Sequence, residues 1–232
     1  MNAQPRAEVL QRVFSIKSGD VTGTAFAVEV DDRQYLVTAK HVVTGINDGG
    51  SIQLRRPDTL AWVDVKLRTV LRCDPADIAV LVPESVLSAG LKSLPVLLGS
   101  QGLVWGGEVY FLGFPFGFDS AARMEGGQYL FPFIKRAVVS AMVRVNDADV
   151  LYLDGYNNPG FSGGPVALFD QSQNKSRIAG VISGYRNEPR QVRMGNTPTQ
   201  LVVDSNAGII IAYSIDPAIK IIRANPVGPK LD

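Results

Sequence analysis

The sequence has little of several features that define common classes of protein. It has one cysteine in 232 residues, Cys73, so no disulfide can form within the chain, which fits a reducing compartment. It has one histidine, His41, which argues against zinc sites built on histidines and cysteines, and we expect no metal and no cofactor. The formal net charge is +1, which provides no general attraction to nucleic acid or to an anionic membrane.

Long apolar segments are also missing. No stretch reaches the ~18 apolar residues of a membrane span. The N-terminal segment MNAQPRAEVLQRVF does not place an apolar run after a positive start, as a secretory signal does. We therefore expect a cytoplasmic protein. Asp74 beside Cys73 opposes ionisation of the thiol, so we interpret Cys73 as a structural residue.

Short runs rich in valine, isoleucine and aromatic residues make up most of the chain. About a dozen runs separated by turn residues predict an all-β fold of two six-stranded Greek-key β-barrels. The runs cover residues 21–30, 34–38, 51–55, 61–72, 78–82, 108–112, 134–145, 150–153, 165–169, 178–183 and 208–213. Helix signal is confined to Arg6–Val13 and to a short C-terminal helix from Pro217 to about Arg223.

A glycine-containing turn at residues 99–102 divides the chain near its middle. We expect an N-terminal extension over 1–20, a first barrel over 21–102, a second barrel over 103–215, and a helix with a tail over 216–232. Two segments, Phe114–Gln128 and Arg186–Asn206, are predicted as long loops, and loops of that length are usually functional or disordered.

The hexapeptide Gly160–Pro165, GFSGGP, carries the strongest chemical signal. Glycines around Ser162 allow a tight turn in which backbone N–H groups converge on one point. We interpret Ser162 as a nucleophile and the amides of Gly160 and Ser162 as an oxyanion hole. The alternative is a glycine-rich turn with no function.

A base and an acid for such a serine are also present. Histidine exchanges a proton near neutral pH, as a general base requires, and His41 follows the end of an apolar strand. A structural histidine is the alternative. Asp77 directly precedes an apolar run, where its carboxyl group can be buried against the histidine ring; Asp74 and Asp64 are the rival acids.

Together these motifs resemble the chymotrypsin family of serine proteases. Residues 38–41, Thr-Ala-Lys-His, are similar to the family's Thr-Ala-Ala-His, and residues 77–80 to its Asp-Ile-Ala-Leu. Residues 160–165 resemble Gly-Asp-Ser-Gly-Gly-Pro, and the order of histidine, aspartate and serine is the family's. Val109–Phe118 resembles the Gly-Asn-Pro-Phe-Gly segment of bacterial HtrA-type and cytosolic trypsin-like peptidases, and Ile209–Ile222 resembles their last strand and closing helix. We expect a form without a PDZ domain.

The resemblance implies a serine endopeptidase that acts on polypeptides through a Ser-His-Asp triad and an acyl-enzyme intermediate. It implies that residues 183–185 pair with the substrate backbone and that Ser183 supports Asp77. Phe161 replaces the aspartate that pairs with a newly cut N-terminus in the digestive enzymes. We therefore do not expect activation of that kind.

The expected substrate-binding residues are Tyr156, Ser183, Gly184 and Tyr185. Tyr156 stands where trypsin has an acid, and Tyr185 where a glycine usually leaves the pocket open. Because this pocket lacks a carboxylate, we do not expect cleavage after arginine or lysine, and we predict a shallow pocket for a small or medium apolar side chain. The alternative is that both tyrosines pack the barrel.

Other functions remain to be weighed against an active protease. The main alternative is a catalytically silent protein that binds extended peptides or acts as a regulatory module. An esterase of the α/β-hydrolase type is disfavoured, because it needs the serine before the acid and the histidine. The sequence leaves open a regulatory protein partner, the oligomeric state, and whether the oxyanion loop is active without a trigger.

Overall fold

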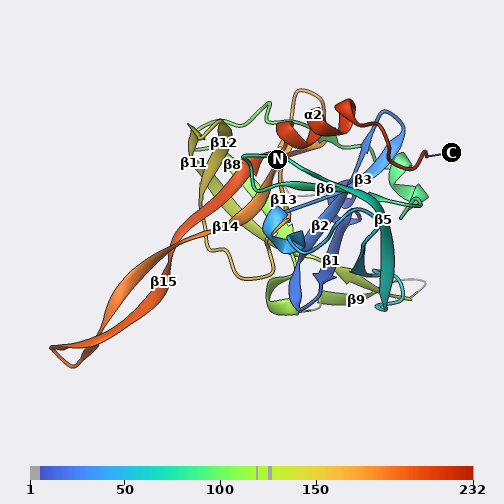
Figure 1. Ribbon diagram of the computed structural model, residues 1–232. Coiled ribbons are helices and arrows are strands. Elements are labelled where there is room, and N and C mark those ends of the chain that lie inside the picture. Colours follow the sequence, from blue (N-terminus) through green and yellow to red (C-terminus); the bar gives the residue numbers. More distant parts are fainter. Residues whose placement is uncertain (1–5, 119, 125–126, 232) are drawn as a thin grey trace.

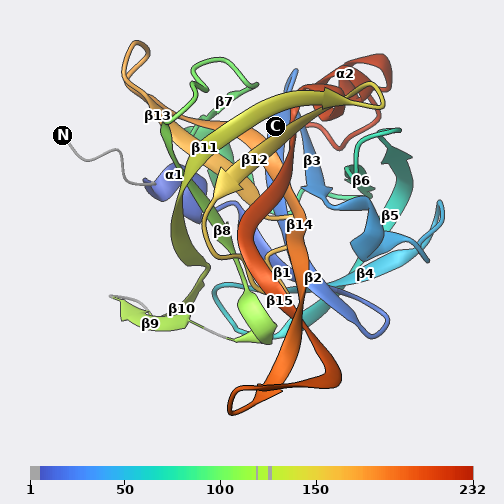
Figure 2. The same cartoon turned by 90° about the vertical axis from the view of Figure 1, so that its left-hand side faces the viewer.

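The computed structural model describes residues 6–118, 120–124 and 127–231 of the chain. Most of these residues lie in β-strands, which form two barrels side by side, as Figures 1 and 2 show. The predicted all-β, chymotrypsin-like fold is confirmed.

The first barrel is a closed sheet of six strands in the order β1-β2-β3-β6-β5-β4. Its strands are β1 (Val13–Ser18), β2 (Val21–Val30), β3 (Arg33–Thr38), β4 (Ser51–Arg55), β5 (Trp62–Arg72) and β6 (Ala79–Pro83). It begins inside the range that we expected to be an N-terminal extension. The reason is that β1 pairs with β2 along its whole length, from Val13 opposite Phe26 to Ser18 opposite Val21.

The second barrel follows the order β13-β8-β11-β12-β15-β14, and β13 also pairs with β14, so these six strands return on themselves. Its strands are β8 (Glu108–Gly113), β11 (Phe133–Val145), β12 (Ala148–Asp154), β13 (Pro165–Asp170), β14 (Lys175–Met194) and β15 (Thr197–Ser214). A short strand before the expected boundary at residues 102–103, β7 (Leu97–Leu98), joins this sheet parallel to β14.

Helices are few and short. Helix α1 (Ala7–Leu10) is shorter than the predicted Arg6–Val13, since the chain enters β1 at Val13, and α2 (Asp216–Ala224) begins one residue before Pro217. Three 3-10 turns, η1 (Lys40–Val43), η2 (Ala89–Ser93) and η3 (Pro115–Gly117), complete the helical residues described. None of the helices in the described ranges is long and apolar enough to cross a membrane.

Both predicted long loops contain regular structure. Within Phe114–Gln128 lie η3, strand β9 (Ser120–Met124) and the start of β10 (Gly127–Phe131), which pairs with β9; positions 119, 125 and 126 of this prediction lie outside the described residues. The prediction of a loop at Arg186–Asn206 is wrong, because β14 and β15 continue there as a paired ribbon that ends in a turn at Gly195. Valine and threonine favour this extended conformation. Figure 1 shows the ribbon as an arm that projects from the second barrel.

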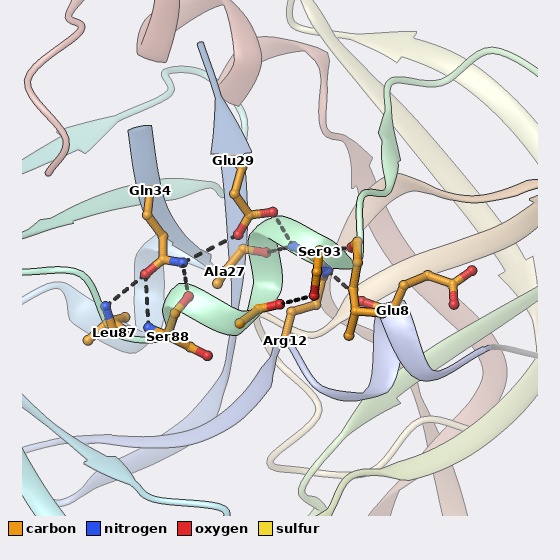
Figure 3. Close-up of polar contacts among 10 residues, drawn as sticks. Glu8, Arg12, Ala27, Glu29, Gln34, Leu87, Ser88 and Ser93 are labelled. Atoms are coloured by element: carbon orange, nitrogen blue, oxygen red, sulfur yellow. Dashed lines mark hydrogen bonds and ion pairs between the residues drawn. The ribbon is translucent and has the colours of Figure 1, made fainter. Parts of the chain in front are cut away.

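A buried arginine fastens the N-terminal segment to the first barrel. The guanidinium group of Arg12 is fully buried and donates to the carbonyls of Glu8, Ala27 and Leu94. It also donates to the carboxylate of Glu29 at 2.6 Å (Figure 3). The connection between the barrels is thereby held against β2.

Candidate active site

The three residues expected to carry the chemistry come from both barrels. His41 lies on η1, directly after β3, and Asp77 lies just before β6. Because β3 and β6 pair from Leu36–Leu81 to Thr38–Ala79, the ends of these strands place both residues on one side of the first barrel. Ser162 lies in the loop between β12 and β13 of the second barrel.

The histidine and the aspartate are in direct contact. Nδ1 of His41 lies 2.7 Å from Oδ2 of Asp77, and the backbone N–H of His41 donates to Oδ1 at 3.0 Å. The hydroxyl of Ser183 donates to the same carboxylate at 2.6 Å. The rival acids lie elsewhere: Asp74 is exposed and pairs with Lys40, and Asp64 is exposed on β5.

These contacts decide the charge of Asp77. Burial raises the pKa of its carboxyl group, but the hydrogen bonds from His41 and Ser183 lower it by more, and the net pKa is below the ordinary value. Asp77 is therefore an anion across the neutral pH range. An anion bound to Nδ1 of the imidazole keeps a proton on that nitrogen and leaves Nε2 as the acceptor.

The serine hydroxyl bonds to a backbone carbonyl and not to the histidine. Oγ of Ser162 donates to the carbonyl oxygen of Ser183 at 3.0 Å, and no hydrogen bond joins it to His41 in the structure described. Ser162 and Asp77 thus both bond to Ser183, whereas no hydrogen bond described joins Ser162 to His41. Such catalytic contacts are often long or misaligned before substrate binds.

Two glycines of the hexapeptide combine a positive φ with a position where no side chain fits. Gly160 has a φ of +100°, and a Cβ there would lie 2.3 Å from the carbonyl oxygen of Phe114. Gly163 has a φ of +86°, and a Cβ there would lie 2.1 Å from the carbonyl oxygen of Thr24. No acceptor among the described residues bonds to the amide of Gly160 or Ser162. Both expected oxyanion donors are therefore unused.

A buried threonine of the first barrel holds this loop. The hydroxyl of Thr24 donates to the carbonyl of Gly160 at 2.7 Å and accepts from the amide of Phe114 at 3.1 Å. Its backbone N–H donates to the carbonyl of Ser162 at 2.9 Å. Sequence reasoning missed Thr24, although a threonine among the buried apolar residues of β2 is a signal of a buried polar contact.

A lysine supports the loop from the second barrel. Nζ of Lys135, on β11, donates to Oδ1 of Asn158 at 3.1 Å and to the carbonyl of Tyr156, and it lies 5.8 Å from the ring centre of Phe161. Desolvation lowers the pKa of Lys135. Phe161 is buried edge-on against Phe111, with ring centres 5.0 Å apart. The side chain before the serine thus packs in an apolar site.

The expected substrate-binding residues differ in their exposure to solvent. Tyr156 is 56% exposed, whereas Gly184 and Tyr185 are half-buried on β14. The buried Asn157, which sequence reasoning missed, donates from Nδ2 to the carbonyl of Gly184 at 3.1 Å. Asn206 donates to the carbonyl of Asn157 at 2.7 Å. Asn157 therefore links the loop before Ser162 to β14.

A large cavity and the one cysteine lie outside the candidate site. A cavity of about 680 Å³ lies between β2, β7 and α2 and is lined by none of the expected site residues. Among the described residues, no three histidines, cysteines or carboxylates are grouped so as to hold a metal. Cys73 is buried, which raises the pKa of its thiol to about 12.

Solved structures share this fold at low sequence identity. The Rv3671c protease of M. tuberculosis, in an inactive form, is 18% identical, with a TM-score of 0.56 and 97% of each chain covered. The HtrA-type protease AlgW, solved with a tripeptide, is 20% identical with a TM-score of 0.58. The match covers 95% of this chain and 63% of that one, so the chain spans less than two thirds of AlgW. A serine endoprotease from Yersinia pestis is 16% identical with a TM-score of 0.55, over 95% of this chain and 67% of that one.

Sequence comparison identifies the family. No curated protein gives a significant match. The model of the trypsin-like peptidase domain matches residues 23–175, which is more than half of the chain and includes His41, Asp77 and Ser162. The chain belongs to the trypsin-like peptidase family and is a serine protease.

Proposed function

We propose that this protease is an endopeptidase that cleaves extended polypeptides through an acyl-enzyme intermediate. Ser162 is the nucleophile, His41 the general base and Asp77 the acid that orients it. The observation that carries the proposal is the pair of hydrogen bonds between His41 and Asp77. It is accompanied by the backbone amides of Gly160 and Ser162, which have no acceptor among the described residues. Each part that acyl transfer by serine requires is then present.

The proposed reaction begins with rotation of the Ser162 hydroxyl from the carbonyl of Ser183 toward Nε2 of His41. The oxygen attacks the substrate carbonyl while the imidazole takes its proton, and Asp77 stabilises the resulting cation. The amides of Gly160 and Ser162 donate to the oxyanion. The imidazolium then protonates the leaving amine, and water hydrolyses the acyl-enzyme by the same route.

The substrate itself can trigger that rotation. A peptide that pairs with β14 needs the carbonyl of Ser183 as an acceptor for one of its amides. The Ser162 hydroxyl occupies this carbonyl at 3.0 Å. Pairing of a peptide with β14 would displace the hydroxyl, and Nε2 of His41 is then the acceptor that remains. In this mechanism an extended substrate aligns the nucleophile that cleaves it.

The proposed specificity excludes basic side chains. The residues expected at the pocket, among them Tyr156 and Tyr185, carry no carboxylate, and neither does the neighbouring Asn157. The bond from Asn157 to Gly184 ties together the loop and the strand that would form its walls. We expect small or medium apolar residues before the scissile bond, and cleavage of a peptide library only after arginine or lysine would refute this.

A fluorophosphonate probe tests the nucleophile directly. The wild-type protein and a Ser140→Ala control should be labelled, because Ser140 is an exposed serine on β11, outside the site. Ser162→Ala should not be labelled and should lose peptide hydrolysis by at least 10³-fold. Labelling of Ser162→Ala to the wild-type extent would show that another residue is the nucleophile.

The second candidate is a silent protein that binds peptides without cleaving them. The open link between Ser162 and His41 favours it. The same probe separates the two candidates when it is tested with and without a long peptide. If the wild-type protein binds the peptide but neither cleaves it nor reacts with the fluorophosphonate under either condition, the protein is a silent peptide-binding protein.

A further inference from the structure

The arm formed by β14 and β15 continues the edge at which the active site lies. In the second barrel, β14 pairs with β13 only as far as Val181 opposite Pro165, and Ile182 makes the last bonds on that side, with Gly163 and Gly164. From Ser183 to Met194, no described strand pairs with this edge of β14, whose other edge is bonded to β15. One unpaired edge thus runs from the reaction centre to the tip of the arm.

The start of this edge is fixed by the serine. The carbonyl of Ser183 is 3.0 Å from Oγ of Ser162, so it faces the site. The next carbonyl, of Gly184, accepts from Asn157, and β14 pairs with β15 along its other edge. An edge strand of this kind can pair with another chain.

The arm has the properties of a sheet that lacks a strand. A two-stranded ribbon that packs on nothing is marginally stable in water, and a third strand makes it much more stable. Between Asn206 and the turn, β15 carries exposed Leu201, Val202 and Val203, and the tip of β14 carries exposed Met194. A strand added along β14 would place its side chains next to Met194.

We propose that the arm binds the part of the substrate upstream of the scissile bond by strand addition. This inference rests on the proposed endopeptidase function. A peptide that pairs antiparallel with β14 and places its scissile carbonyl at Ser162 must run its N-terminal residues along Tyr185 to Met194. The protease therefore selects long extended segments that precede the cleavage site, in addition to the residue at the pocket.

The charges of the edge strand define the preferred segment. Arg190 is neutralised by Glu188 at 3.1 Å, and Arg193 donates to the carbonyl of Asn196 in the turn. Arg186, which follows Tyr185, is exposed and makes no ion pair with any residue described. This cation lies just beyond the pocket, and it favours a carboxylate a few residues upstream of the scissile bond.

The test compares two extensions of one short peptide that the protein cleaves. One adds about eight residues upstream and the other adds the same residues downstream, a length that matches the arm at ~3.3 Å per residue. For the wild-type protein we expect kcat/KM to rise at least tenfold with the upstream extension, through KM, and to change less than twofold with the downstream one. The reverse result, or an equal gain for both extensions, overturns the proposal.

An arm-deleted variant provides the control. Residues 188–205 are replaced by Asn-Gly, which joins the paired Asn187 and Asn206 in a two-residue hairpin. Fluorophosphonate labelling and cleavage of the short peptide should stay at the wild-type level, and the gain from the upstream extension should disappear. Retention of the gain overturns the proposal. If deletion instead converts a dimer into a monomer in sedimentation and leaves the gain unchanged, the arm is a contact between two copies and the proposal fails.

A single substitution covers the case in which the deleted protein does not fold. Arg186→Glu should reverse the preference between upstream segments that carry glutamate and those that carry lysine. Arg144→Glu, a change of an exposed arginine on β11, should leave the preference unchanged.

Failure of the endopeptidase function is recognised separately, as absence of labelling and of short-peptide cleavage in the wild-type protein. Affinity of Ser162→Ala for the two extended peptides, measured by fluorescence anisotropy, then still tests the arm.

Discussion

The two halves of the candidate site differ in how completely they are assembled. The half on the first barrel is connected: three hydrogen bonds converge on Asp77 and fix His41 against it. In the half on the second barrel, Ser162 bonds to a carbonyl of its own barrel and not to the histidine. The proposed base is thus held in place in the chain without substrate, whereas the proposed nucleophile is not yet bonded to it.

The position of each residue relative to the two barrels explains part of this difference. His41 and Asp77 follow and precede two strands that pair directly, so the barrel itself brings them together. Ser162 lies in a loop that is held within the second barrel, by Ile182 among others, and also by the bonds of Thr24 between the barrels. Contacts within one barrel form with the barrel, but contacts between barrels can be adjusted by a ligand. Regulation of this protease is therefore expected at the serine.

The largest expected effect comes from breaking the assembled half. Asp77→Asn leaves the geometry similar but removes the anion that keeps the proton on Nδ1 of His41. We expect kcat for peptide hydrolysis to fall about 10⁴-fold, or about 5.5 kcal/mol of transition-state stabilisation, with little change in KM. Ser183→Ala, which removes one neutral donor to the same carboxylate, is the control and should cost far less. A loss under tenfold for Asp77→Asn would mean that the assembled half is not the catalytic base.

The next effect concerns the barrel that carries the assembled half. Arg12→Met leaves the carboxylate of Glu29 and three carbonyls without their buried donor. We expect a loss of about 3–5 kcal/mol in the free energy of unfolding, measured with urea. The folded fraction should keep its rate of fluorophosphonate labelling, because Arg12 has no contact with the site. Adding Glu29→Gln should restore part of the stability, and a double variant as unstable as the single one would contradict the ion-pair explanation.

Much of the fold was predictable because it depends on local patterns. Alternating apolar runs reveal the strands, and Gly163 is needed where the two barrels approach to van der Waals contact. The arm was not predictable, because the prolines and polar residues in Arg186–Asn206 resemble those of a loop. Its strands are defined by their pairing with each other, which neither segment shows by itself. Tyr156, six residues before Ser162, is the residue expected in the pocket, but the buried residue is its neighbour Asn157. A one-residue shift of this kind reverses which side chain points inward, and only the three-dimensional contacts reveal it.

Removing the hydrogen bonds of Thr24 between the barrels should give a smaller effect. Thr24→Val preserves shape but leaves the carbonyl of Gly160 and the amide of Phe114 without a partner. We expect a loss of about 1–3 kcal/mol in stability and a slower rate of labelling at Ser162. Thr38→Val is the matched control, since Thr38 is equally buried and bonds to the carbonyl of Thr24, not to the oxyanion loop. Equal labelling rates in the two variants would mean that Thr24 stabilises the barrel without positioning the loop.

The smallest effect is the pH dependence that Asp77 adds to stability. Burial raises the pKa of this carboxyl group, but the hydrogen bonds lower it below its ordinary value of 3.8. The unfolded chain therefore binds a proton at a higher pH than the folded chain, and the stability from Asp77 is complete above 3.8 and is lost as the pH falls through the folded value. Urea unfolding of the wild-type protein and of Asp77→Asn should show a difference at pH 7 that shrinks only below about pH 4. If the difference grew with acid, burial would outweigh the hydrogen bonds, and the first-barrel half would be less completely assembled than its contacts indicate.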